Sequence, residues 1–225
     1  MKSSRSAQDV PLMQMYRALQ TAYGPQHWWP GDSPTEIVIG AILTQNTNWK
    51  NVEKAIGNLK AKKMLDWTAL RRVSPARLSR LIRPAGYYNI KARRMKNFVA
   101  WLFETYDGDL DRLRSIKPAK LRRELLDVNG IGPETADSIM LYALDIPTFV
   151  IDAYTGRIAR RHYLADESAE YDDLKEMFES RLRRRASLFK EYHALIVRVA
   201  KEHCRTRAVC SGCPLEAFPH DADRH

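Results

Sequence analysis

The sequence predicts an all-α protein, because helical periodicity runs through most of its 225 residues and strand-like alternation is hard to find. Helix-start signals support this class. Ser33-Pro34-Thr35-Glu36 has the pattern of a capping box with proline at the first helical position, and it opens a helix that runs through Ile37, Ile39, Ile42 and Leu43. Glycine and proline pairs punctuate the remaining helical stretches, as expected for a chain of short helices and loops.

The other helices are predicted from the same periodicity, each ending near a helix breaker. In chain order they cover residues 8–22, 49–60, 66–72, 75–82, 88–105, 108–114, 118–128, 134–144, 153–163, 170–185 and 190–203. The breaks are predicted at Gly24-Pro25, Pro84-Ala85-Gly86, Asp107-Gly108, Asn129-Gly130 and Ile146-Pro147. No internal repeat or low-complexity linker interrupts this order.

Charge favours a polyanionic partner. The chain carries 37 Lys+Arg against 27 Asp+Glu, a net charge of +10, and the excess is clustered at 91–96, 157–161 and 181–185. No apolar run approaches the roughly 20 residues of a membrane span, and the polar start at Met1–Arg5 lacks a signal-peptide core. We therefore expect a cytoplasmic protein with no membrane partner.

The segment Val128–Asp137, sequence VNGIGPETAD, links two amphipathic stretches through a glycine-x-glycine turn. We expect Gly130 and Gly132 to take positive φ and to let the backbone approach a partner closely, and Pro133 suits the first turn of the following helix. Backbone N–H groups exposed at such a turn bind phosphate. An ordinary helix–helix turn is the alternative for an isolated glycine pair.

Together with Asp152 in Val150-Ile151-Asp152, this turn resembles the helix-hairpin-helix plus Gly/Pro-Asp signature of the endonuclease III superfamily of DNA glycosylases. The resemblance extends from about Trp28 to Cys213. Among its members, the monofunctional 3-methyladenine glycosylases of the endonuclease III type are the most similar. Their sequences contain blocks that resemble three segments of this chain, Trp28-Trp29-Pro30, Gln45-Asn46-Thr47 and Arg83-Pro84-Ala85-Gly86-Tyr87-Tyr88-Asn89.

The resemblance implies two helical domains with DNA and a flipped base in the cleft between them. One is a six-helix domain at 27–146 that ends in the helix-hairpin-helix. The other combines 1–26 with 147–225 and carries the C-terminal cysteine loop. The expected partner is double-stranded DNA, bound by a monomer associated with the nucleoid.

Asp152 occupies the aspartate position of the family and is the expected catalytic residue. A carboxylate beside the anomeric carbon stabilises an oxocarbenium-like sugar and activates water. A plain helix N-cap is the other interpretation of Asp152, and one residue can serve both roles. Bifunctional relatives carry a lysine after the hairpin that attacks the sugar, whereas this chain has Glu134 there. We therefore expect no lyase activity.

The resemblance also implies a base pocket and a DNA-contacting set. The pocket residues are Trp28, Trp29, Pro30, Trp49, Lys201 and Glu134. The DNA-contacting residues are Gln45, which fills the gap left by the flipped base, and Asn129, Gly130, Ile131, Gly132 and Thr135 of the hairpin. Electron-rich rings suit a cationic alkylated purine. The plainer interpretations are core tryptophans, a surface lysine and a polar glutamine in a helix.

All three cysteines lie near the C-terminus as Cys204-x5-Cys210-x2-Cys213. Similar enzymes hold a four-cysteine iron–sulfur cluster there, but the fourth cysteine is missing and Phe218-Pro219-His220 stands in its place. Three alternatives stay open: a [4Fe–4S] cluster with His220 as fourth ligand, a zinc ion held by three cysteines and His220, or no metal.

The function predicted from the sequence is a monofunctional base-excision DNA glycosylase acting on alkylated purines such as 3-methyladenine. One alternative keeps the class and changes the substrate, to a mismatched or oxidised pyrimidine. A second alternative is a non-catalytic helix-hairpin-helix DNA-binding protein. The carboxylate of Asp152 argues against it, because a protein that only binds phosphate has no use for a buried carboxylate at that spacing.

Overall fold

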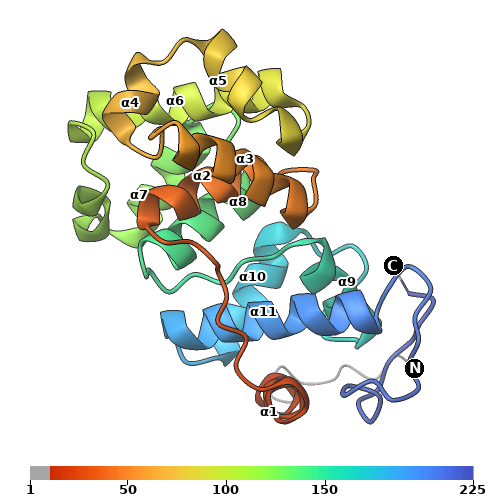
Figure 1. The fold of residues 1–225 in the computed structure, drawn as a ribbon. Coiled ribbons are helices and arrows are strands. Elements are labelled where there is room, and N and C mark those ends of the chain that lie inside the picture. The colour runs from red at the N-terminus through yellow and green to blue at the C-terminus, as the bar shows by residue number, and fades with distance from the viewer. Residues whose placement is uncertain (1–10, 225) are drawn as a thin grey trace. The chain divides into compact units, whose positions relative to one another are not determined.

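The computed structural model describes residues 11–224, and this range consists of helices and loops without a β-strand (Figure 1). The chain divides into two compact units. The central unit is Trp29–Ile146, and the terminal unit combines the chain up to Trp28 with the chain from Pro147 onward. Residues 8–10 of the predicted first helix lie outside the described residues. The all-α prediction is confirmed.

The central unit is a set of helices around an apolar α2. Its elements are α2 (Pro34–Thr44), α3 (Trp49–Ala61), α4 (Trp67–Arg72), α5 (Pro75–Leu81), η1 (Arg83–Ala85), α6 (Tyr88–Tyr106), η2 (Asp111–Ser115), α7 (Pro118–Asp127), α8 (Pro133–Ser138) and η3 (Ile139–Ala143). Residues 38–43 of α2 are buried without exception, because α3, α6, α8 and η3 all contact this helix. A helix that is apolar all round belongs inside such a bundle.

Side-chain caps explain where several of these helices begin. Ser33, Asn48, Asp66 and Ser74 each accept a hydrogen bond from the backbone N–H three residues later, which stabilises each helix start by about 1 kcal/mol. The predicted capping box at Ser33 is only half formed. Glu36 accepts from the N–H of Asp32 at 3.1 Å, one residue before the expected partner, and it also pairs with Lys60 at 2.9 Å.

The terminal unit contains α1 (Leu12–Tyr23), α9 (Ala153–Arg161), α10 (Tyr171–Arg181) and α11 (Ala186–Glu202), followed by a C-terminal loop. Phe149 stacks on Phe178 with ring centroids 4.1 Å apart, and both rings meet Tyr192 edge-on. The Tyr192 hydroxyl donates to the carbonyl of Leu12 at 2.8 Å. These contacts tie the N-terminal helix to the C-terminal third of the chain.

Most helix bounds match the prediction to within a few residues, with two differences in type. The stretch predicted at 108–114 is a 3₁₀ helix at Asp111–Ser115. The helix predicted at 134–144 changes at Ile139 into a π-helical turn. Between residues 11 and 224, no helix combines the length and the apolar character needed to cross a bilayer.

Candidate active site and DNA-binding hairpin

The turn between α7 and α8 depends on one glycine rather than two. Gly130 has φ +97°, in the region that disfavours side chains. Gly132 has φ −91° and is the N-cap of α8, so the expectation of positive φ at Gly132 is wrong. Proline follows at the first helical position, where extended backbone at the N-cap is ordinary and needs no glycine. Ile131 is buried and anchors the turn.

Two side-chain contacts brace the hairpin. Asp137 is fully buried on α8, and the guanidinium of Arg122 on α7 donates to both its oxygens at 3.0–3.3 Å. The Asn97 amide of α6 donates to the carbonyl of Asn129 at 2.9 Å. Such two-pronged arginine–carboxylate pairing fixes geometry as well as charge. The ion pair therefore joins α7 to α8, and Asn97 holds the turn at Asn129.

Gln45 lies directly after α2, and its side chain is attached to the hairpin. Its amide nitrogen donates to Thr135 Oγ1 at 2.9 Å and to the carbonyl of Gly130 at 3.2 Å. The Arg94 guanidinium donates to the Gln45 carbonyl oxygen. Gln45, Gly130 and Thr135, which were predicted separately as DNA contacts, thus form one group within the central unit. No local pattern in the sequence indicates Arg94 as their partner.

The end of α2 that leads to Gln45 is fixed by a buried lysine. The ammonium of Lys91 donates to the carbonyls of Leu43 and Ala85 at 2.8 and 2.7 Å. Burial, and then the nearby Arg94, lower the pKa of Lys91 to about 8. A cation at the C-terminal carbonyls of a helix is favourable, and this one locates the segment that carries Gln45.

Asp152 lies in the terminal unit as the N-cap of α9. Its Oδ1 accepts the backbone N–H of Thr155 at 2.7 Å, so the capping role is present. Burial raises the pKa of Asp152, but His193 and the Thr155 N–H together outweigh burial and hold it below its ordinary value. The side chain retains 15% exposure. Asp152 is therefore a mostly buried carboxylate that stays ionised.

The second carboxylate oxygen faces a residue that was not predicted. His193 Nε2 of α11 lies 3.7 Å from Asp152 Oδ2. The two residues are 41 positions apart, so periodicity and spacing could not pair them. The available signal was an imidazole inside the apolar run 192–197, where a histidine needs a polar partner.

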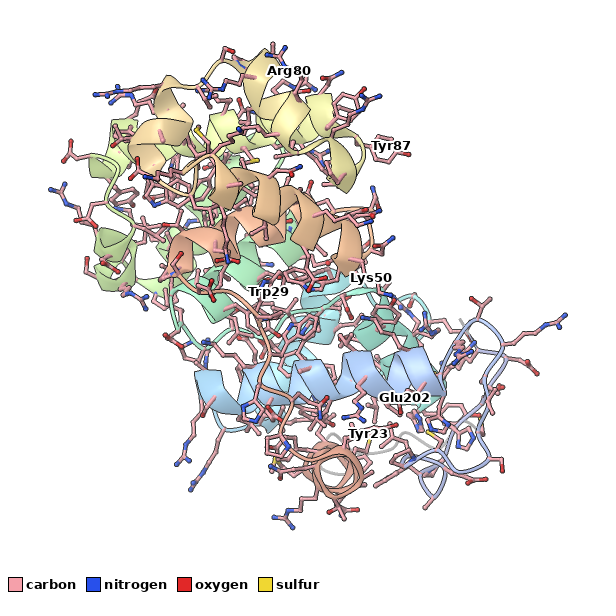
Figure 2. The ribbon with its side chains drawn as sticks, in the orientation of Figure 1. Tyr23, Trp29, Lys50, Arg80, Tyr87 and Glu202 are labelled. Atoms are coloured by element: carbon pink, nitrogen blue, oxygen red, sulfur yellow. The ribbon has the colours of Figure 1, made fainter. Side chains whose placement is uncertain are left out.

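The predicted base-pocket residues form two aromatic groups, one in each unit. In the central unit, the ring of Trp29 lies 5.2 Å from both Trp49 and Tyr142. Tyr142 belongs to the π-helical turn and was not predicted. Figure 2 labels Trp29 at the start of this unit. Pro30 and Trp49 also line a hollow of about 310 Å³ beside α2 and α3.

In the terminal unit, Lys201 lies over two rings. Its ammonium is 5.9 Å from the Trp28 ring centroid and 5.7 Å from that of Tyr154. Tyr154 follows Asp152 by two positions on α9, so this group lies on the same helix start as the carboxylate. Glu134 belongs to the central unit, where it is exposed in the first turn of α8.

Tyr87 is an exposed aromatic that the sequence did not single out as a site. It is 68% exposed with φ +43°, and it points outward at the start of α6 in Figure 2. A positive φ in a bulky residue carries a strain of about 1–3 kcal/mol and is most often kept at functional sites. Tyr87 lies between Arg83 and the basic stretch at 91–96.

The cysteine loop follows α11 in the terminal unit. Cys204, Cys210, Cys213 and His220 line one cavity of about 20 Å³, which has room for about one water molecule. In residues 11–224, no three His, Cys, Asp or Glu side chains are grouped as a metal site. In this arrangement the four side chains do not fit an iron–sulfur cluster or a zinc ion.

A buried arginine holds the same loop. Arg161 is 1% exposed, and its guanidinium donates to the carbonyls of Arg205, Thr206 and Arg224 at 2.6–3.0 Å and to Cys204 Sγ at 3.3 Å. A charged donor that satisfies several carbonyls orders the loop around it.

Comparison with known proteins places this fold and these motifs in a family. Residues 39–184 match the model of the HhH-GPD superfamily of base excision DNA repair proteins, and the chain belongs to that superfamily. It is 48% identical to the "Putative DNA repair glycosylase MJ1434" of Methanocaldococcus jannaschii over 92% of this chain and 94% of the relative. The predicted relationship to the endonuclease III superfamily is confirmed.

Two solved structures share the fold. The H. pylori 3-methyladenine DNA glycosylase MagIII, bound to 1,N6-ethenoadenine, is 26% identical with a TM-score of 0.73, covering 86% of this chain and 98% of that one. A non-covalent endonuclease III–DNA complex has a TM-score of 0.81 at 19% identity and covers 97% of both chains.

Proposed function

We propose that this protein is a monofunctional DNA glycosylase that hydrolyses the N-glycosidic bond of alkylated purines, of the 3-methyladenine kind, in double-stranded DNA. The observation that carries the proposal is Asp152, a carboxylate that stays ionised at the N-terminus of α9 although it is mostly buried. An ionised carboxylate in a low-dielectric setting stabilises the positive charge that develops on the sugar.

The DNA contacts in this proposal come from the hairpin group and from Tyr87. The backbone around Gly130 faces phosphates, which positions the duplex without reading its sequence. Gln45 moves from the hairpin to fill the space of the flipped nucleotide, and Tyr87 stacks on an exposed base. The net charge of +10 favours association with the polyanion.

The aromatic groups support the proposed substrate class. N3- and N7-alkylated purines are cationic, so the leaving base is already activated and needs an electron-rich surface more than an acid. Trp29, Trp49 and Tyr142 supply such a surface. The ring of Trp28 already lies under the cation Lys201, so the group around Trp49 is the one we assign to the cationic base.

A panel of damaged duplexes tests the function. Single-turnover reactions with 3-methyladenine, 7-methylguanine, 1,N6-ethenoadenine, uracil opposite guanine, and thymine glycol would be assayed with and without later alkaline cleavage. We expect release of the methylated purines and strand breaks only after alkali. Preferred release of uracil or thymine glycol would give the pyrimidine-specific alternative, and binding without any release would give the non-catalytic one.

Borohydride tests the monofunctional assignment. The hairpin contains no lysine, and Glu134 stands at the place of the attacking amine. We expect borohydride to trap no covalent complex between the wild-type protein and a duplex from which it releases the base, because no Schiff base forms. Endonuclease III on its own substrate serves as the positive control. A trapped band from this protein would refute the assignment.

Trp49→Ala tests the cationic-base assignment. We expect it to cost about 1–3 kcal/mol in transition-state stabilisation for 3-methyladenine and less for neutral 1,N6-ethenoadenine or uracil. Trp67→Ala is the matched control, since Trp67 is also a partly buried tryptophan of the central unit but packs on Phe98. Equal losses for cationic and neutral bases, with equal drops in melting temperature for both variants, would make Trp49 a core residue only.

A further inference from the structure

His193 is a buried polar residue, and the free-energy cost of burying its imidazole needs an explanation. It is 5% exposed on α11, and its neighbours Tyr192, Ala194, Leu195 and Ile196 are buried as well. An apolar side chain would fill this position without the free-energy cost of removing an imidazole from water. Because that cost is offset only by polar contacts, the polar group that His193 faces indicates its role.

The group it faces is the carboxylate of Asp152. Oδ1 of Asp152 accepts the Thr155 N–H at 2.7 Å, and His193 Nε2 lies 3.7 Å from Oδ2. That second distance is within ion-pair range and slightly longer than a hydrogen bond. Catalytic hydrogen bonds are often long in the free enzyme and shorten when substrate binds. The Thr155 N–H at one oxygen and the imidazole beside the other limit rotation of the carboxylate plane.

We propose that His193 is a positioning residue for Asp152, holding its carboxylate from the Oδ2 side while Thr155 holds Oδ1. The inference rests on the proposed function, in which Asp152 acts on the sugar. Asp152 caps α9 and His193 lies on α11, and these two helices pack together. The pair therefore sits on regular elements, which hold a reacting group more accurately than loops do.

Three variants separate positioning from packing. His193→Met keeps an apolar side chain of similar size and removes the donor, whereas His193→Gln keeps an N–H donor. Tyr192→Phe is the matched stability control, because Tyr192 is the adjacent buried residue and its hydroxyl binds Leu12 rather than Asp152. Each would be measured for melting temperature, affinity for lesion-bearing duplex and single-turnover rate of base release.

We expect His193→Met to slow base release by about tenfold to a hundredfold, with duplex affinity within about twofold. His193→Gln should recover most of that loss, and Tyr192→Phe should keep a near wild-type rate although it melts lower. The proposal is overturned by a His193→Met rate no lower than that of Tyr192→Phe. It is also overturned by a His193→Gln rate as low as that of His193→Met.

A double-mutant cycle on melting temperature tests the contact without any activity. Because His193 Nε2 lies 3.7 Å from Asp152 Oδ2, the stability losses of His193→Met and Asp152→Asn should be less than additive in the double variant. Strictly additive losses would overturn the inference. Clear coupling in a protein that releases no base from any duplex would support the contact between the two residues and refute the glycosylase assignment instead.

Discussion

We expect Asp152→Asn to slow base release in a single turnover by about a thousandfold, or about 4 kcal/mol in the barrier. In the proposed mechanism, the substitution removes the negative charge that stabilises the sugar cation. Asparagine is as good an N-cap as aspartate, so the hydrogen bond to Thr155 N and the start of α9 should survive. Duplex affinity should therefore change little, because the lost interaction belongs to the transition state.

Asp152→Ala is the informative companion variant. It removes both the charge and the cap, so it should lose about 1 kcal/mol of stability in addition to the same loss of rate. A drop of less than about tenfold for Asp152→Asn would mean that another carboxylate acts on the sugar. The comparison separates the capping contact that the structure shows from the proposed role of Asp152 on the sugar.

In the proposed mechanism, the ionisation of Asp152 also determines where the rate of base release falls at acidic pH. The folded protein holds the pKa of Asp152 below its ordinary value, so its contribution to stability is fully present above the ordinary carboxyl range. That contribution is lost as the pH falls through the lowered folded pKa. The wild-type rate should accordingly persist through mildly acidic pH, since the carboxylate remains ionised there.

The helices were predictable because their signals are local. Ser33, Ser74 and Asp152 each cap a helix through the backbone N–H three residues later, and proline follows the first two of them. Both signals can be recognised in the local sequence. The π-helical turn at Ile139 carries no such signal. The turn contacts α2, a helix far from it in the sequence, and local signals do not record such contacts.

The parts of the site that escaped prediction depend on long-range contacts. Lys91 and Arg161 belong to basic clusters in the sequence, which indicates exposed cations. In the structure both are buried, and their ammonium and guanidinium groups bind backbone carbonyls that are far away in the sequence. His193 is recognisable only once α9 and α11 are packed together. Trp28 and Trp29 are adjacent in sequence, but they belong to different aromatic groups in different units.

The sequence also does not distinguish the two glycines of the hairpin, of which only Gly130 has a positive φ. They provide a matched pair of variants. We expect Gly130→Ala to destabilise the central unit by about 2–4 kcal/mol, combining the cost of a side chain at φ +97° with overpacking. A Cβ at Gly130 would overlap Arg94 Cγ and lie 2.9 Å from Arg94 Cδ. Gly132→Ala should be nearly neutral, because φ is −91° and nothing lies within 4 Å of its Cβ position.

Gly130→Ala should also weaken DNA binding by about tenfold or more, equally for damaged and undamaged duplexes, because phosphate contacts position DNA without reading it. Displacing Arg94 would disturb Gln45, which binds both Arg94 and Gly130. Thermal melting and duplex affinity of both variants would be compared at one salt concentration. Equal losses for Gly132→Ala would contradict the backbone argument. Loss confined to one lesion would place the hairpin in base recognition, because a phosphate-binding turn has no means of distinguishing one base from another.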